Sequence, residues 1–350
     1  MKKLNILFLL LAVFSATAQD IHFSQYFNAP LALNPSMTGL TNGVARVSVS
    51  YRNQWFSATT GGFFKSPYMT TGISADMPIR IKKDVLGVGL FVANDQAGAN
   101  TFTTVIAQAS VSYIKTLGKK DNHRLSAGVQ FGYTHQWIKT ENFQFANQFQ
   151  DNVFVAAIPN NENITLNKVG YINMNFGLMY YGQVHKQLAI FVGGSAYNVT
   201  TPGYNILPEQ KRDLYFRWNA HGGLDIIIKK QYHILPTGIF MRQGVNDQLN
   251  TGIGFGFDFE KRFSRDNRDL QFTIGVMNRI HNLTKGVTSD AIAPYFSFLV
   301  NGFKLGFSYD VTISKLKSAG SAVGALELMV GYNISTRDSR HNKELVVPRF

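Results

Sequence analysis

Residues 125–134 read Leu-Ser-Ala-Gly-Val-Gln-Phe-Gly-Tyr-Thr, so that larger or apolar side chains alternate with small or polar ones. A period of two places successive side chains on opposite faces of a β-strand, whereas a helix would need apolar residues every three or four positions. The same alternation recurs in residues 45–52, 172–180, 253–259 and 303–311. The chain is therefore predicted to be all-β, with strands that each carry one apolar and one polar face.

About fourteen such strands fit within residues 44–335, each near the roughly 9–11 residues that a tilted strand needs to cross a bilayer. Their apolar faces carry Phe, Leu and Ile, and their opposite faces carry Ser, Asn, Gly and occasional Arg. This pattern predicts a transmembrane antiparallel β-barrel with lipid outside and a polar lumen, because an open sheet edge could not satisfy its hydrogen bonds in lipid. A soluble exported β-protein is the alternative.

The lengths of the connections support the barrel. With the first strand rising from the periplasm, every second connection is short: residues 78–84, 117–123, 182–187, 229–232 and 301–302. The others include two much longer stretches, residues 138–168 and 199–214. Short periplasmic turns and long external loops are typical of outer-membrane barrels.

The N-terminus indicates export. Lys2 and Lys3 precede an apolar stretch that ends at Phe14, and residues 16–18 read Ala-Thr-Ala, the pattern of a signal-peptidase site. Residues 1–18 are therefore predicted to be a signal peptide. The formal net charge of +13 would suit a nucleic-acid partner, but export argues against one. The chain has no cysteine, which excludes disulfides, thiolate metal sites and a lipid-anchored lipoprotein.

Much of the positive charge falls on the short turns that are predicted to face the periplasm. This candidate basic rim comprises Lys82, Lys83, Lys119, Lys120, Lys229, Lys230, Lys261, Arg262, Arg265 and Arg268. Anionic phospholipid headgroups would attract such a rim. An acidic periplasmic protein partner would also fit, and the sequence leaves both interpretations open.

Two terminal segments do not alternate cleanly. Residues 19–43 are dense in aromatic residues, amides and prolines, which fits neither a strand nor a helix. A disordered tail would not carry so many large apolar side chains, so we expect a plug-like segment that packs inside the lumen or across its periplasmic mouth. Residues 336–350 are expected to form a C-terminal periplasmic tail.

Three short motifs resemble those of a known family. The matching residues are Phe23, Ser24, Gln25, Tyr26, Asn34, Pro35 and Gly39 near the N-terminus; Tyr51, Arg52, Asn53, Gln54 and Trp55 in the first strand; and Tyr309, Asp310, Ser314, Lys315 and Leu316 near the C-terminus. The chain resembles the PorP/SprF family, outer-membrane barrels of the type IX secretion system in Bacteroidetes. Many relatives carry a cysteine before a terminal Pro-Arg-Phe, where this chain has Val347.

The resemblance implies a non-enzymatic outer-membrane protein that aids export or surface attachment of cargo such as gliding adhesins. It implies binding to the C-terminal domain of the cargo, to periplasmic lipoproteins of the machinery, or to both. The sequence does not separate a SprF-like cargo helper from a PorP-like core component. An outer-membrane channel for small or hydrophobic solutes, similar to the fatty-acid channels, is the alternative function.

Each conspicuous residue also has a purely structural interpretation. Trp55 suits the aromatic girdle at the membrane interface. Arg46 and Arg52 are expected to pair with lumen acids such as Asp76, Asp258 or Asp310, because buried charges need partners. No arrangement of histidines, serines or glycines has the spacing of a catalytic, metal or cofactor site. We therefore expect no enzyme activity, metal or cofactor.

The loop at residues 138–168 is the candidate cargo surface. Its aromatic residues are Phe143, Phe145, Phe149 and Phe154. Apolar side chains among amides suit protein recognition, but the loop could instead fold over and plug the barrel. Because about fourteen strands fall below the roughly 16–18 that leave an open channel, the chain itself is not expected to conduct folded cargo.

Overall fold

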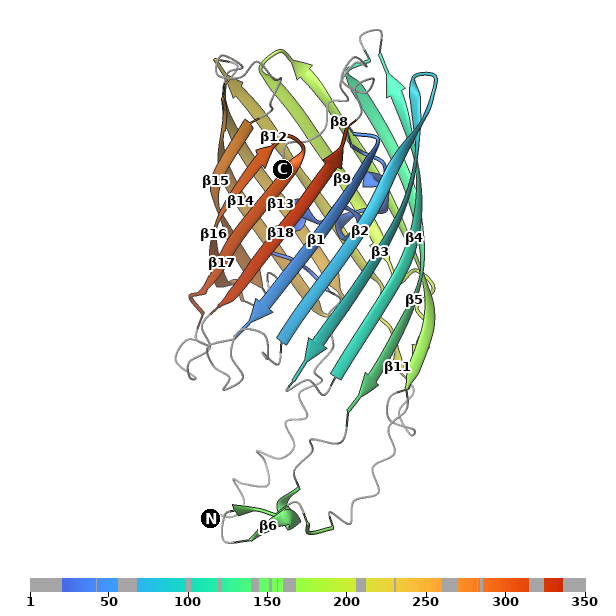
Figure 1. Ribbon diagram of the computed structural model, residues 1–350, viewed down its shortest axis with the longest axis vertical. Helices are drawn as coiled ribbons and strands as arrows, with labels where there is room; N and C mark the ends of the chain where they lie inside the picture. Colours follow the sequence, from blue (N-terminus) through green and yellow to red (C-terminus); the bar gives the residue numbers. More distant parts are fainter. Residues whose placement is uncertain are drawn as a thin grey trace.

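The computed structural model describes residues 21–41, 43–55, 68–98, 102–118, 121–139, 145–150, 153–155, 157–159, 168–205, 212–229, 231–259, 270–281, 283, 286–314 and 324–335. Within these residues, fourteen strands form one closed antiparallel barrel (Figure 1). The predicted fold class and strand number are confirmed. No described helix is long and apolar enough to cross a membrane.

Each barrel strand pairs with the strands before and after it, and the first strand pairs with the last. The barrel strands are β1 (Ala45–Gln54), β2 (Tyr68–Ile81), β3 (Asp84–Ala97), β4 (Phe102–Leu117), β5 (His123–Ile138), β8 (Val169–His185), β9 (Leu188–Tyr197), β12 (Arg217–Ile228), β13 (Tyr232–Gln243), β14 (Asn246–Asp258), β15 (Leu270–His281), β16 (Thr288–Val300), β17 (Phe303–Thr312) and β18 (Ala325–Ile334). Two short hairpins lie outside the barrel sheet, β6 (Phe149–Gln150) with β7 (Val153–Phe154) and β10 (Gly203–Tyr204) with β11 (Arg212–Asp213).

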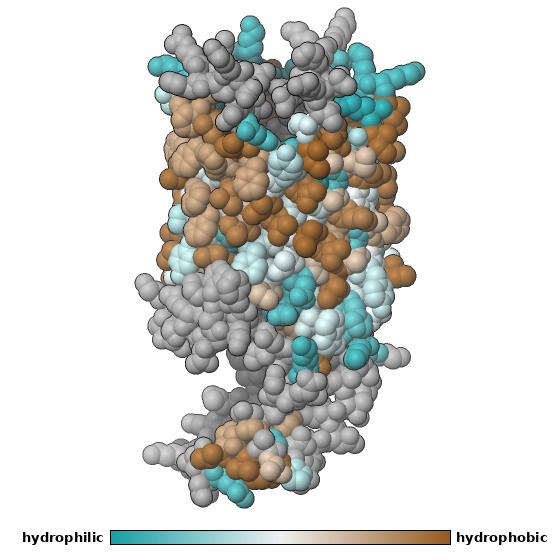
Figure 2. Space-filling view, viewed as in Figure 1, coloured by the Kyte–Doolittle hydropathy of each residue, from teal (hydrophilic) through white to brown (hydrophobic). Residues whose placement is uncertain are grey.

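The alternating pattern of the sequence places the apolar side chains on the outer surface of the barrel. In β8, Ile172 and Leu178 are 68% and 63% exposed, whereas Asn175 between them is fully buried. On the face that Figure 2 shows, the result is an apolar band across the middle of the barrel. A lipid bilayer would cover this band, because contact between so much apolar surface and water is unfavourable.

The two ends of the barrel differ as predicted. We call the end with the short turns the inner end and the end with the long connections the outer end. At the inner end, β2 and β3 are joined across residues 82–83, and β16 and β17 across residues 301–302. At the outer end, 30 residues (139–168) separate the end of β5 from the start of β8. Some connections depart from the pattern. At the outer end, β13 and β14 are joined by residues 244–245 alone and β3 and β4 by residues 98–101, and at the inner end residues 259–269 join β14 to β15.

Residues 21–41, which we call the lumen segment, lie inside the barrel (Figure 1). They fold as three short helical turns: η1 (Tyr26–Asn28), α2 (Pro30–Leu33) and η2 (Pro35–Met37). Pro30 and Pro35 begin α2 and η2, where a missing N–H costs nothing and the fixed φ favours a helix. Local turns rather than a strand therefore form in this proline-rich stretch.

The hydrophobic core lies between the lumen segment and the wall. Tyr26, Phe27, Leu33, Met37 and Leu40 pack with inward-facing residues of the strands. Those wall residues are Val85, Ile114, Met179, Tyr181, Phe191, Ile239, Met277, Ala293 and Tyr295. The sequence predicted a lumen face of Ser, Asn, Gly and Arg. Many inward wall residues are of these kinds, such as Arg52, Ser112 and Asn175, but the prediction did not include these large apolar side chains. Large apolar groups occur inward because the lumen holds protein there rather than water.

Several predicted features lie outside the described residues. They are the signal peptide at residues 1–18, Phe143, Lys119, Lys120, Lys230, Lys261, Arg262, Arg265, Arg268, Lys315, Leu316 and the tail at residues 336–350.

Candidate functional site

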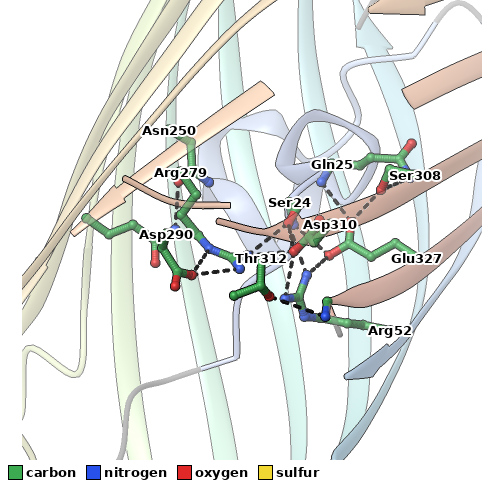
Figure 3. A network of polar contacts seen from close by, with 12 residues as sticks. Ser24, Gln25, Arg52, Asn250, Arg279, Asp290, Ser308, Asp310, Thr312 and Glu327 are labelled. Carbon is green, nitrogen blue, oxygen red and sulfur yellow. Dashed lines mark hydrogen bonds and ion pairs between the residues drawn. The ribbon is translucent and has the colours of Figure 1, made fainter. Parts of the chain in front are cut away.

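A buried cluster of charges holds the outer part of the lumen segment (Figure 3). We call Arg52, Arg279, Asp290, Asp310 and Glu327 the outer ion cluster. They come from β1, β15, β16, β17 and β18, and all point into the lumen. Asp310 and Glu327 are fully buried.

The charges in this cluster compensate one another. Arg52 pairs with Asp310 at 3.0 Å and with Glu327. Arg279 pairs with Asp310 at 2.7 Å and with Asp290 at 3.0 Å. Removing one partner from such a buried pair costs about 3–5 kcal/mol, because the remaining charge is left without compensation. The cluster is therefore expected to tolerate substitution poorly.

The lumen segment adds its own groups to the cluster. The backbone N–H groups of Ser24 and Gln25 donate to the two carboxylate oxygens of Glu327, at 2.7 and 2.9 Å. The Ser24 hydroxyl donates to Asp310 at 2.9 Å and accepts from Arg52 at 3.0 Å. Hydrogen bonds to charged groups are about twice as strong as neutral ones. The segment is thus fastened at this point by charge-assisted contacts.

Three of the sequence motifs meet at this cluster. Ser24 and Gln25 belong to the N-terminal motif, Arg52 to the first-strand motif and Asp310 to the C-terminal motif. Neither Glu327 nor Arg279 belongs to one of the sequence motifs. Their only signal was an inward position in an alternating strand, which many residues share.

Asn34 and Pro35 sit at the middle of the lumen. The Asn34 side-chain oxygen accepts from the Ser36 backbone N–H at 2.9 Å and from its hydroxyl at 2.7 Å, which caps η2. The Asn34 amide donates to the carbonyl oxygens of Leu178 and Gly194, each at 3.1 Å. All four hydrogen-bonding positions of this buried side chain are filled.

A row of small residues makes room for this part of the segment. The row crosses six neighbouring strands in register and consists of Gly87, Ser112, Gly128, Gly177, Ser195 and Asn219. A Cβ on Gly128 would overlap Pro35 and lie 2.5 Å from the Ser36 nitrogen. A side chain at this position would therefore exclude the segment.

Polar members of the wall bind the backbone of the segment. Ser112 donates to the Thr38 carbonyl at 2.6 Å, Ser195 to the Leu33 carbonyl at 3.0 Å, and Asn219 to the same Leu33 carbonyl at 3.2 Å. Ser126, two residues before Gly128 in β5, donates to the Ser36 carbonyl at 2.6 Å. These bonds satisfy carbonyls that an irregular buried segment could not pair within itself.

A second ion pair fastens the inner part of the segment. Arg46 binds Asp76 through two hydrogen bonds of 2.9 and 2.8 Å and also donates to the carbonyls of Met37 and Leu40. The Gly39 N–H donates to Asp76 at 2.7 Å. Gly39 has φ of +71°, and a Cβ there would lie 2.5 Å from the Gly87 Cα, so only glycine fits.

Two of the expected lumen ion pairs are present in the structure. The pairs of Arg46 with Asp76 and of Arg52 with Asp310 are confirmed. Asp258 does not contribute to them and lies 3.7 Å from His233 instead.

Residues 51–55 and Ser314 of the motifs lie near the outer end. The Trp55 and Tyr68 rings meet edge to face, with centroids 4.8 Å apart. Asn53 is fully buried, and its amide donates to the Tyr51 hydroxyl at 3.2 Å. The Ser314 hydroxyl donates to Asp290 at 3.1 Å and so joins the outer ion cluster.

The described part of the basic rim lies at the inner end. Lys82 and Lys83 form the turn between β2 and β3, and Lys229 follows β12. Lys83 is largely exposed and pairs with Asp121 at 3.2 Å. An exposed pair of this kind contributes about 1 kcal/mol or less to stability, so Lys83 could exchange it for a contact with a binding partner at little cost.

The candidate cargo loop contains a small folded unit, the β6–β7 hairpin. The Phe149 and Phe154 rings are 5.6 Å apart, and the Phe145 N–H donates to the Gln148 side chain at 3.2 Å. Phe149 and Val153 are 45% and 63% exposed. Figure 1 places the hairpin beyond the outer strand ends, and Figure 2 shows an apolar patch on it. The lumen is occupied by residues 21–41, not by this hairpin.

In the described part of the chain, no group of three or more His, Asp or Glu residues is arranged to hold a metal ion.

A closed barrel with an apolar outer band, and with short turns at one end and longer loops at the other, defines the class of integral outer-membrane β-barrel proteins. The sequence matches the family described as "Type IX secretion system membrane protein PorP/SprF" over residues 15–332. The chain belongs to this family, a family of secretion membrane proteins located in the outer membrane. No curated protein matches the chain significantly.

One solved structure with a TM-score above 0.5 supports the fold. The ΔS2 mutant of the TodX monoaromatic hydrocarbon channel is 8% identical, with 89% of this chain and 94% of that chain covered and a TM-score of 0.51. A Pseudomonas aeruginosa FadL homologue is 9% identical, with 87% and 94% covered and a TM-score of 0.40. At 8% identity, the likeness to the TodX mutant concerns the barrel architecture alone.

Proposed function

We propose that this protein is an accessory barrel of the type IX secretion machinery. It aids the export or surface attachment of cargo such as gliding adhesins, and it does not itself conduct the cargo. It binds the C-terminal domain of the cargo at its outer end, periplasmic machinery at its inner end, or both. The occupied lumen is the observation that carries the proposal.

The occupied lumen supports a binding role over a conducting one. Leu31, Asn34 and Ser36 of the lumen segment are fully buried against the wall. The segment is fastened near the outer end through Glu327 and near the inner end through Asp76. A cargo chain could pass only if these contacts were broken, so recognition would take place on the two ends of the barrel.

Conductance in planar bilayers tests the closed lumen. The wild-type barrel should show little steady conductance, and a variant that lacks residues 21–41 should conduct if it inserts. Large steady conductance or saturable solute flux through the wild-type protein would contradict the proposal. Such a result would favour the alternative function, a channel for small or hydrophobic solutes.

The outer-end hairpin is the proposed cargo contact, because Phe149 and Val153 expose apolar side chains on a folded unit outside the lumen. Deleting residues 144–161 should abolish capture of the cargo's C-terminal domain and leave barrel insertion unchanged. The double variant Phe149→Asp, Val153→Asp should have the same effect without shortening the loop. Capture at the wild-type level by both variants would contradict this contact.

The basic rim is the proposed contact for a periplasmic partner. Charge reversal at Lys261, Arg262, Arg265 and Arg268 should release that partner from affinity purifications of native membranes analysed by mass spectrometry. As a control, charge reversal at the two external lysines Lys139 and Lys168 should not release that partner. Retention of all partners by the rim variant would instead favour a role in binding anionic phospholipid.

A further inference from the structure

The closing seam of the barrel joins the two ends of the chain. Among the described barrel strands, β1 and β18 are the pair farthest apart in sequence, and ten residues of each are in register from Ala45 with Ile334 to Gln54 with Ala325. Every other pair in the barrel joins consecutive barrel strands, with only the β6–β7 and β10–β11 hairpins inserted between the strands of two of these pairs. Closing this seam therefore fixes the longest loop in the fold and has the largest entropic cost of any strand pairing.

The lumen segment contacts β18 at both of its ends. Near the outer end, the Ser24 and Gln25 N–H groups donate to Glu327. Near the inner end, the Thr41 hydroxyl donates to the Asn333 side chain at 3.0 Å. The next residues continue the contact, because the Val44 N–H donates to the Ile334 carbonyl at 2.7 Å.

The segment also bridges the strands on either side of the seam. The Ser24 hydroxyl lies between Asp310 of β17 and Arg52 of β1. The Gln25 amide donates to Ser308 of β17 at 3.0 Å. Ser24 is 28 residues from Arg52 but 303 residues from Glu327. A segment attached closely to the first strand thus carries the groups that bind the last two.

We propose that the lumen segment is an intramolecular closure clasp, which binds the β17–β18 hairpin and brings it to β1 so that the barrel closes. Two backbone N–H groups of the segment bind Glu327 of β18. This contact places Glu327 beside Arg52, which is its register partner in β1 across the seam. The segment converts one long-range closure into two steps: its own attachment to β18, followed by zipping of β1 onto a strand that is already close. This role is independent of secretion.

A pair of substitutions at Gln25 isolates the clasp. Gln25→Pro removes the N–H that donates to Glu327, and the φ of −81° at this position is close to the value that proline adopts. Gln25→Ala also loses the side chain but keeps the N–H, so it is the matched control. Any difference between the two variants reports the backbone contact and the restriction that proline places on Ser24.

Engineered cysteines report closure, because the chain has none of its own. Val49→Cys with Val330→Cys places facing thiols across the seam, and Ala75→Cys with Leu90→Cys places them across the β2–β3 hairpin. All four side chains point outward, away from the lumen segment. Disulfide formation is followed during refolding of the full chain in detergent with diamide as oxidant.

The Gln25→Pro variant should form the seam disulfide at least about tenfold more slowly than Gln25→Ala. This factor corresponds to the loss of one hydrogen bond to a charged group. The rate of the β2–β3 disulfide should be the same in both variants. Equal seam rates in the two variants would overturn the proposal. Equal slowing of both disulfides by proline would overturn it as well, because that would be a general folding defect.

Discussion

Gly177 is the position at which a single methyl group should displace the lumen segment. A Cβ on Gly177 would overlap the side-chain oxygen of Asn34 and lie 2.9 Å from its Cγ and 3.0 Å from the Cδ of Pro35. Asn34 cannot move aside freely, because its amide is bound to the carbonyls of Leu178 and Gly194. Gly177→Ala therefore requires the segment to shift.

The structure gives the magnitude of the effect. A shift of Asn34 breaks or weakens its four hydrogen bonds, two through the amide and two with Ser36. Each is worth about 1 kcal/mol net, and a buried group left unsatisfied costs about 1–3 kcal/mol. We expect Gly177→Ala to weaken seating of the segment by about 2–4 kcal/mol, roughly a 30- to 1,000-fold change in the equilibrium.

Two readouts measure this change. Urea unfolding in detergent gives the loss of stability, and planar bilayers give the conductance that appears when the segment leaves the lumen. Gly238→Ala is the matched control, because a Cβ on Gly238 would meet its nearest neighbour, the Asn250 carbonyl oxygen, at 3.8 Å. It should change neither readout.

A double-mutant cycle tests the cause. Asn34→Ala removes the side chain that the new methyl group would meet, so Gly177→Ala should cost much less in that background than in the wild type. The reasoning would be refuted if Gly177→Ala behaved like Gly238→Ala. It would equally fail if the cost of Gly177→Ala were the same with and without the Asn34 side chain.

Three further predictions concern other parts of the molecule. Arg52→Ala should lower the free energy of unfolding in urea by about 3–5 kcal/mol because it leaves buried carboxylates unpaired, whereas Lys83→Ala should cost about 1 kcal/mol or less; equal losses would contradict this. Ile274→Arg, on the outward face of β15 and 53% exposed, should cost about 2–4 kcal/mol in lipid vesicles, and an unchanged stability there would argue against burial in the bilayer. Phe149→Asp with Val153→Asp should leave the melting temperature of the barrel unchanged; a clear drop would show that the hairpin packs on the barrel.

Much of the fold could be predicted from the sequence because it depends on local periodicity. A strand surrounded by lipid on one face must alternate, so residues 125–134 and 172–180 predicted strands and the direction of their side chains. The difference between short and long connections gave the two ends of the barrel. The motif residues, such as Ser24 and Arg52, were also visible in the sequence, but only as isolated stretches.

The sequence by itself determined the all-β architecture, the approximate strand number and the apolar band, because each follows from neighbouring residues along one strand. It also indicated that Arg46 and Arg52 need acidic partners, since a buried charge must be compensated. Only the tertiary structure decided that residues 21–41 fill the lumen, and that Glu327 and Arg279 complete the outer ion cluster. Closure of the barrel brings residues about 300 positions apart into contact, and no local pattern encodes which of many inward-facing polar residues will meet there.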